Sequence, residues 1–191
     1  MRENKLCEAI RQVAWAYIVI HVHINLGTID IFADWLGYVW ILMALPVLAE
    51  EIPAVKLLRH LGWMLTIWTF LTWALTIVGI SLSEILGYLG PLADVVYVVI
   101  HLYFHFQLLT NLAQLAAKYE CMSKGWLLHL RTIRTIIVTL FCLQIPWQNN
   151  DVFYGIYIVV GTIQILAAFC ICKALFQLRK ELWNRLQSAR E

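Results

Sequence analysis

Six apolar runs alternate with short polar connectors along the chain. A transmembrane helix needs about 20 residues, with a working range of roughly 17–25. The third, fourth and sixth runs are long enough unaided, whereas the others must borrow flanking residues or thin the bilayer locally. The pattern therefore predicts an all-α bundle of about six transmembrane helices in one integral membrane domain, residues 1–191. The predicted spans are 13–26, 35–49, 61–80, 92–117, 132–147 and 152–175.

Composition supports a lipid environment. Hydrophobic residues make up 62% of the chain and charged residues 14%, against roughly 45–50% and about 25% in soluble domains. A soluble domain of this length cannot bury so much apolar surface. A net charge of +2 without a basic block excludes nucleic acid as a partner.

The basic residues fix the orientation of the six-span arrangement. The connectors 27–34, 81–94 and 148–151 contain no lysine or arginine, so all 14 fall on the opposite side. Basic residues stay on the cytoplasmic side. Both termini are therefore expected in the cytoplasm, with the chain in a bacterial cytoplasmic membrane. The 14 residues are Arg2, Lys5, Arg11, Lys56, Arg59, Lys118, Lys124, Arg131, Arg134, Lys173, Arg179, Lys180, Arg185 and Arg190.

The last segment, 176–191, carries leucines at helical spacing with basic residues between them. This pattern is typical of an amphipathic helix on the inner leaflet that binds anionic lipid headgroups. A docking helix for a membrane-protein partner is the alternative.

Each even span opens on an aspartate that a tyrosine follows closely. Asp34, Asp94 and Asp151 are 60 and 57 residues apart. Aspartate is a good N-cap because its carboxylate accepts hydrogen bonds from free helix N–H groups. We expect these three residues to be outer helix caps. Three related hairpins would explain the recurrence, although aspartate caps are common enough to recur without any repeat.

Polar residues inside the spans are the candidates for function, because lipid makes them costly. They concentrate in the outer half of two spans: His21, His23 and Asn25 in the first, His101 and His105 in the fourth. If these spans pack together, the imidazoles would meet. His101 and His105 have the i, i+4 spacing that two-histidine metal sites use. A solute site, a metal or haem site and a proton relay fit this pattern, as do hydrogen bonds that join helices.

Enzyme signatures are mostly absent. The chain contains no zinc-binding His-Glu-x-x-His, no Gly-x-Ser-x-Gly nucleophile turn and no Gly-rich phosphate loop. Glu50-Glu51 with His101 and His105 resembles the glutamate and histidine pattern of CAAX-type prenyl proteases. That family places an arginine where this chain has Val55, and the glutamates fall at the inner edge. A non-enzymatic protein is favoured, and the sequence names no cofactor.

The turn 25–38 contains Asn-x-Gly followed by Asp-x-x-Gly-Tyr. It resembles the first outer turn of small, uncharacterised multi-pass membrane proteins of Gram-positive bacteria, in which a proline usually stands where this chain has Ala33. The resemblance covers 14 residues and implies a bacterial membrane but no activity. Size and span number are also similar to the substrate-binding subunits of energy-coupling-factor vitamin transporters. Their docking motif Ala-x-x-x-Ala is not matched by Ala9, Ala14 and Ala16.

Helix packing explains much of this turn. Gly27 is expected to end the first helix, and Gly37 is expected to let a neighbouring helix approach closely. A ligand or ion bound by Asn25, Asp30 and Asp34 is the alternative.

Taken together, these features favour a small-solute-binding or transport subunit, or an accessory protein, that opens outward around His21, Asn25, His101 and His105. One alternative is a haem- or metal-binding redox protein that uses the same histidines. Another is a structural scaffold of a membrane complex.

Overall fold

The computed structural model describes residues 2–21, 25–26, 29–30, 33–144 and 151–188. This part of the chain is helical apart from one two-stranded ladder and short turns between helices, which confirms the all-α class. The elements are α1 (Arg2–His21), β1 (Asn25–Leu26), β2 (Ile29–Asp30), α2 (Asp34–Glu51), η1 (Pro53–Val55), α3 (Lys56–Ile77), α4 (Leu82–Leu86), η2 (Gly87–Leu89), α5 (Gly90–Lys118), α6 (Ser123–Gln144) and α7 (Asp151–Ser188).

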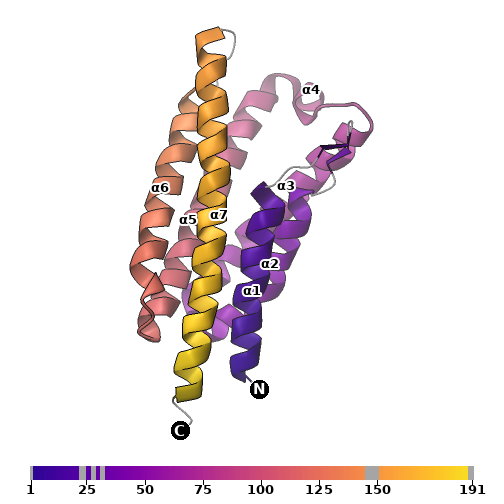
Figure 1. Ribbon diagram of the computed structural model, residues 1–191. Helices are drawn as coiled ribbons and strands as arrows, with labels where there is room; N and C mark the ends of the chain where they lie inside the picture. Colours follow the sequence, from indigo (N-terminus) through magenta and orange to yellow (C-terminus); the bar gives the residue numbers. More distant parts are fainter. Residues whose placement is uncertain (1, 22–24, 27–28, 31–32, 145–150, 189–191) are drawn as a thin grey trace.

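The six long helices form a closed ring. Each packs against two neighbours in the order α1, α2, α3, α5, α6, α7 and back to α1. Both chain termini lie at the same end of the bundle (Figure 1). Consecutive long helices are therefore neighbours, as three hairpins require, while the repeat relationship between the hairpins stays a prediction.

Three helical stretches are long and apolar enough to cross a membrane: Pro53–Ile77, Glu84–Lys118 and Gly161–Ser188. Their outward faces carry large apolar side chains that are exposed, such as Trp63, Ile67 and Phe70 on α3. Such a continuous apolar surface is typical of helices that face lipid, where no water has to be excluded.

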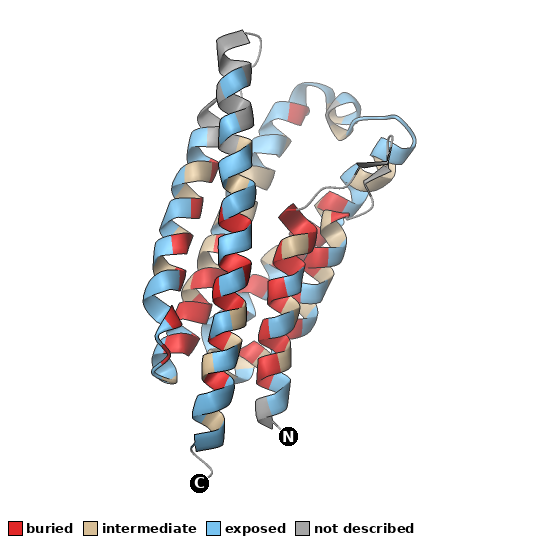
Figure 2. Cartoon of the chain, in the orientation of Figure 1, coloured by how far each residue is buried: buried red, intermediate tan, exposed pale blue. Residues whose placement is uncertain are grey.

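Buried residues concentrate in the half of the bundle that holds the termini, whereas the other half of α5, α6 and α7 is mainly exposed (Figure 2). This core continues into the end of α7, where Leu175, Leu178 and Leu182 are fully buried. The predicted separate helix on the inner leaflet is therefore wrong. No glycine or proline interrupts α7 after Gly161, so the helix runs on unbroken and its leucine stripe packs into the bundle.

The first hairpin differs from its predicted form. α1 ends at His21 rather than at residue 26, and Asn25 pairs with Asp30 across a short antiparallel ladder. The turn-forming residues between the two runs explain this β-hairpin. Gly27 lies outside the described residues, so its predicted role at the end of the first helix stays a prediction.

The predicted aspartate caps are only partly placed as expected. Asp34 is the first residue of α2, and its N-cap position belongs to Ala33, which makes no side-chain cap. Asp94 lies inside α5, because that helix already begins at Gly90. Asp151 is the first residue of α7. A carboxylate in a first turn still complements the helix dipole, but the N-cap role of Asp34 and Asp94 is wrong.

Gly37 does bring two helices together. A Cβ atom built on Gly37 would clash with the Ile20 side chain and would lie 2.9 Å from the carbonyl oxygen of Ala16. The backbones of α1 and α2 therefore approach closely at this residue, as the sequence predicts. This contact sits beside Tyr17 and Tyr38 and so positions the candidate site.

Candidate functional site

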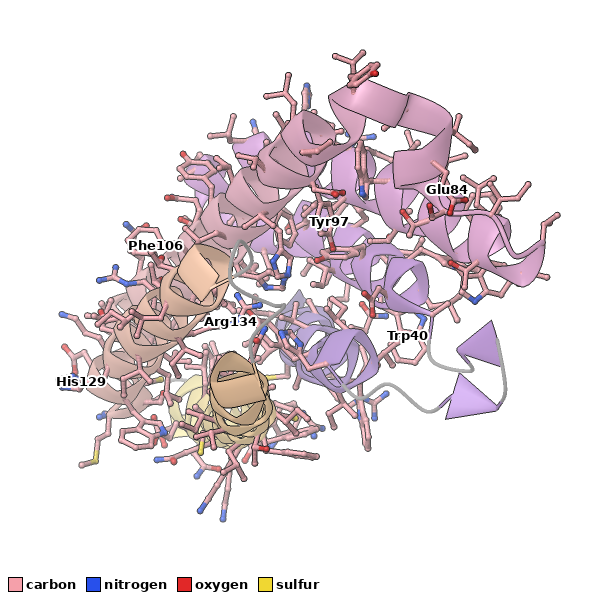
Figure 3. All side chains as sticks on the ribbon, turned by 90° about the horizontal axis from the view of Figure 1, so that it is seen from above. Trp40, Glu84, Tyr97, Phe106, His129 and Arg134 are labelled. Atoms are coloured by element: carbon pink, nitrogen blue, oxygen red, sulfur yellow. The ribbon has the colours of Figure 1, made fainter. Side chains whose placement is uncertain are left out.

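A buried polar cluster lies where the packed core ends, at the C-terminal end of α1. We use the name "polar cluster" for its six residues, which come from four helices. They are Tyr17 and His21 of α1, Tyr38 of α2, His101 and His105 of α5, and Arg134 of α6. Seen from above, the Arg134 side chain points from α6 toward the middle of the ring (Figure 3).

Arg134 and His21 form the first part of the cluster. An Nη2 hydrogen of Arg134 is donated to Nε2 of His21 at 2.9 Å, and Nδ1 of His21 lies 2.9 Å from the carbonyl oxygen of Tyr17. Arginine can only donate, so Nε2 must accept, and the proton of His21 sits on Nδ1. His21 is therefore neutral, and its tautomer is set by these two partners.

His105 forms the second part. It is fully buried, with Nδ1 at 3.0 Å from the hydroxyl of Tyr17 and Nε2 at 3.3 Å from the hydroxyl of Tyr38. A neutral imidazole has one donor and one acceptor, so one tyrosine donates to the ring and the other accepts from it. His101 packs edge-on against His105, with ring centroids 4.6 Å apart, and stacks on Tyr97.

The charge of Arg134 is the unusual feature of the cluster. The residue is only 4% exposed, and no carboxylate of the described residues forms an ion pair with it. Its partners are the neutral His21 and the ring of Tyr17, whose centroid lies 5.8 Å from Cζ. Burying an unpaired ion costs several kcal/mol. The negative end of the α1 helix dipole stabilises the Arg134 cation by at most about 2 kcal/mol. The residues that the structure describes around Arg134 do not offset this cost.

On the side of the chain termini the cluster is closed. Leu108, Leu112 and Leu115 of α5 are almost completely buried in the ring. Beyond them, Nζ of Lys118 lies 2.6 Å from Oε2 of Glu51 and ties α5 to α2. The hydroxyl of Tyr119 donates to the same oxygen at 3.0 Å.

On the other side the residues that the structure describes are sparsely packed. α1 stops at the level of the cluster, while α5, α6 and α7 continue past it (Figure 1). Large apolar side chains of this part of α7, such as Val159 and Ile163, are exposed. The cluster therefore lies at the boundary between a sealed half and a loosely packed half of the bundle.

The structure brings together three of the predicted site residues, since His21 and His105 have ring centroids 5.7 Å apart and His101 contacts His105. His23 lies outside the described residues. Asn25 lies in β1, but its side chain is not among those described. A ligand-binding role for these residues stays a prediction.

Sequence reasoning missed Tyr17 and Tyr38. It counted Arg134 among the cytoplasmic basic residues at the start of the span 132–147, whereas the structure buries Arg134 inside α6. A signal for Arg134 was present, because it continues the stripe of buried residues along α6 at spacings of three and four. That stripe consists of Leu127, Leu130, Arg134 and Val138.

A metal centre gains no support here. Both ring nitrogens of His105 already contact tyrosine hydroxyls. Among the residues that the structure describes, no three histidine, cysteine, aspartate or glutamate side chains are grouped to hold a metal ion. The protease-like pairing is also separated, since Glu51 binds Lys118, 13 residues or about 20 Å along α5 from His105.

Comparison of the chain with protein-family models, curated proteins and solved structures gives no match. The fold and the polar cluster therefore carry the functional argument by themselves.

Proposed function

We propose that the protein is a small-solute-binding or transport subunit of a bacterial cytoplasmic membrane that binds an anionic solute at Arg134. All six long helices would cross the membrane, with both termini in the cytoplasm. α7 supports this arrangement, because its 38 residues span about 57 Å, more than the roughly 40–45 Å of a whole bilayer.

The observation that carries the proposal is the buried guanidinium of Arg134, which has no carboxylate partner among the described residues. An ionisable residue inside a membrane bundle marks a binding site or pathway in most cases. Guanidinium pairs with carboxylate or phosphate oxygens through two parallel hydrogen bonds. Arg134 uses one nitrogen for His21, so other donors remain for a ligand. A small carboxylate or phosphate would supply the missing negative charge.

The surrounding residues define how such a solute would be held. His21 fixes the Arg134 side chain, while Tyr17, Tyr38 and His105 form a hydrogen-bonded wall whose hydroxyl protons can rotate toward an anion. The solute would enter from the loosely packed outer half. Passage to the cytoplasm would require the leucine layer of α5 and the Glu51–Lys118 pair to separate.

Thermal unfolding of the purified protein in mild detergent tests the proposal. The probes are sodium acetate, citrate and inorganic phosphate, with acetamide as the neutral match for acetate. A ligand at 100 times its Kd stabilises by about 2.7 kcal/mol. We expect at least one anion to raise the Tm of the wild type while acetamide does not. Equal effects of acetate and acetamide, with none from the other anions, would contradict it.

The Arg134→Gln variant assigns the effect to the polar cluster, and Arg59→Gln, at an exposed position on α3, is the control. The anion shift should vanish in the first variant and persist in the second. An anion shift that survives in Arg134→Gln would refute the site.

A further inference from the structure

A second feature lies at the cytoplasmic end, away from the polar cluster. The first turns of α1 and the last turns of α7 enclose a groove of about 620 Å³. Four residues of α7 line one wall of the groove at the spacing i, i+3, i+4, i+7, which puts them on one face of the helix. The wall residues used below are Cys7 and Glu8 of α1 and Phe176, Arg179, Lys180 and Trp183 of α7.

The charge of the groove is positive. Glu8 forms an ion pair with Arg11, which offsets its negative charge. The side chains of Arg179 and Lys180 have no carboxylate partner among the residues that the structure describes. Two cations therefore stand beside each other on one wall without local compensation.

The apolar part of the groove is aromatic. Trp183 is exposed, and Phe176 packs edge-on against the exposed Trp15 of α1 with ring centroids 5.8 Å apart. Exposed tryptophans are enriched at the membrane–water interface, where a ring can face acyl chains on one side and headgroups on the other. The groove thus passes from aromatic rings to cations along one helix face.

Helix length places the groove at headgroup depth. Arg179 follows Asp151, the first residue of α7, by 28 residues, which is about 42 Å of helix. A bilayer with its headgroup regions is roughly 40–45 Å thick. With Asp151 at the outer surface, Arg179 and Lys180 reach the headgroups of the inner leaflet.

We propose that this groove binds one anionic phospholipid of the inner leaflet, with its phosphate on Arg179 and Lys180 and an acyl chain along Phe176 and Trp15. The site is formed by two helices, unlike general attraction of a basic tail to the membrane. It does not depend on the solute site at Arg134, from which it is separated by the buried core.

Native mass spectrometry of the protein released from detergent, with added lipid, tests this site. The probes are short-chain phosphatidylglycerol, phosphatidylcholine with the same acyl chains, and inorganic phosphate. Each lysine or arginine near an anionic headgroup contributes about 1 kcal/mol to its binding. Loss of both cations should therefore weaken the affinity for the first phosphatidylglycerol molecule about 30-fold. We expect this loss in the double variant Arg179→Gln with Lys180→Gln, and no preference for phosphatidylglycerol over phosphatidylcholine to remain.

The matched control is Lys124→Gln with Lys173→Gln, which removes the same charge from exposed positions of α6 and α7. It should bind phosphatidylglycerol like the wild type, and both double variants should keep the wild-type Tm. Equal weakening in the control would mean general electrostatic attraction and would overturn the proposal. Displacement of the lipid by equimolar phosphate would also overturn it, because the site would then recognise free phosphate.

Discussion

Replacement of Gly37 by alanine tests how the polar cluster is positioned. The added Cβ would lie 2.9 Å from the carbonyl oxygen of Ala16 and would collide with Ile20. The Ile20 side chain can rotate away, but the helix carbonyl cannot, so α1 and α2 must move apart. Overpacking of this kind costs typically 1–3 kcal/mol, while alanine regains up to about 1 kcal/mol of helix propensity. Because the clash is with a backbone carbonyl, the cost falls in the upper part of this range, about 2–3 kcal/mol, and the expected net loss is about 1–2 kcal/mol.

Gly125→Ala is the matched control. Gly125 also lies near the start of a helix, but a Cβ built there meets nothing within 4 Å. In thermal unfolding, about 1 kcal/mol corresponds to roughly 2–4 °C for a chain of this size. Gly37→Ala should therefore lower the Tm by about 2–8 °C, and Gly125→Ala should leave it equal or higher. A Tm for Gly37→Ala at or above that of the control would refute the close-packing argument.

Three further predictions concern the ends of the helices. Glu120 has φ of +53° after α5, so Glu120→Gly should stabilise by about 1 kcal/mol in denaturant unfolding; destabilisation would contradict this. Burial opposes ionisation of Glu181, but hydrogen bonds donated by Ser123, Gln177 and the Met122 backbone together outweigh it and lower the pKa of this carboxyl. This stabilisation is present above the ordinary pKa of 4.5 and lost as pH falls below it. The Tm advantage over Glu181→Gln should shrink by about pH 4, and a constant difference would count against it. In a cysteine-free background, an impermeant thiol reagent should label Tyr88→Cys in intact cells but Met122→Cys only after permeabilisation; the reverse would overturn the orientation.

The helices were predictable because a helix that faces lipid must be apolar along its length, so each apolar run of the sequence predicted one helix. Boundaries were less predictable. α1 ends at His21 and α5 begins at Gly90 because turn chemistry, not hydrophobicity, decides where a helix stops. The capping box of Ser81 and Glu84 that opens α4 is a readable signal that hydropathy alone overlooks.

The meeting of His21 with His105 was predictable, since polar groups within apolar spans must find one another. Arg134 was not found because hydropathy assigns an arginine near a span end to the interface. Only the position of Arg134 on the buried face of α6 shows that its side chain points into the bundle. Tyr17 and Tyr38 were hidden for a related reason: tyrosines are common at membrane interfaces, and their hydroxyl partners come from residues 88 and 67 positions away.

The most direct test of the central claim is the Tm of the double variant Arg134→Met with His21→Leu. If the role of Arg134 is to bind an anion, its removal should stabilise the ligand-free protein. Replacing buried ionic groups by apolar ones raises the free energy of unfolding by up to about 1–4 kcal/mol. Removing His21 as well means that its Nε2 acceptor is not left buried without the Arg134 donor. The account predicts a higher Tm together with loss of every anion-induced shift. A lower Tm, or an anion shift that persists, would show that Arg134 serves the fold and not a ligand.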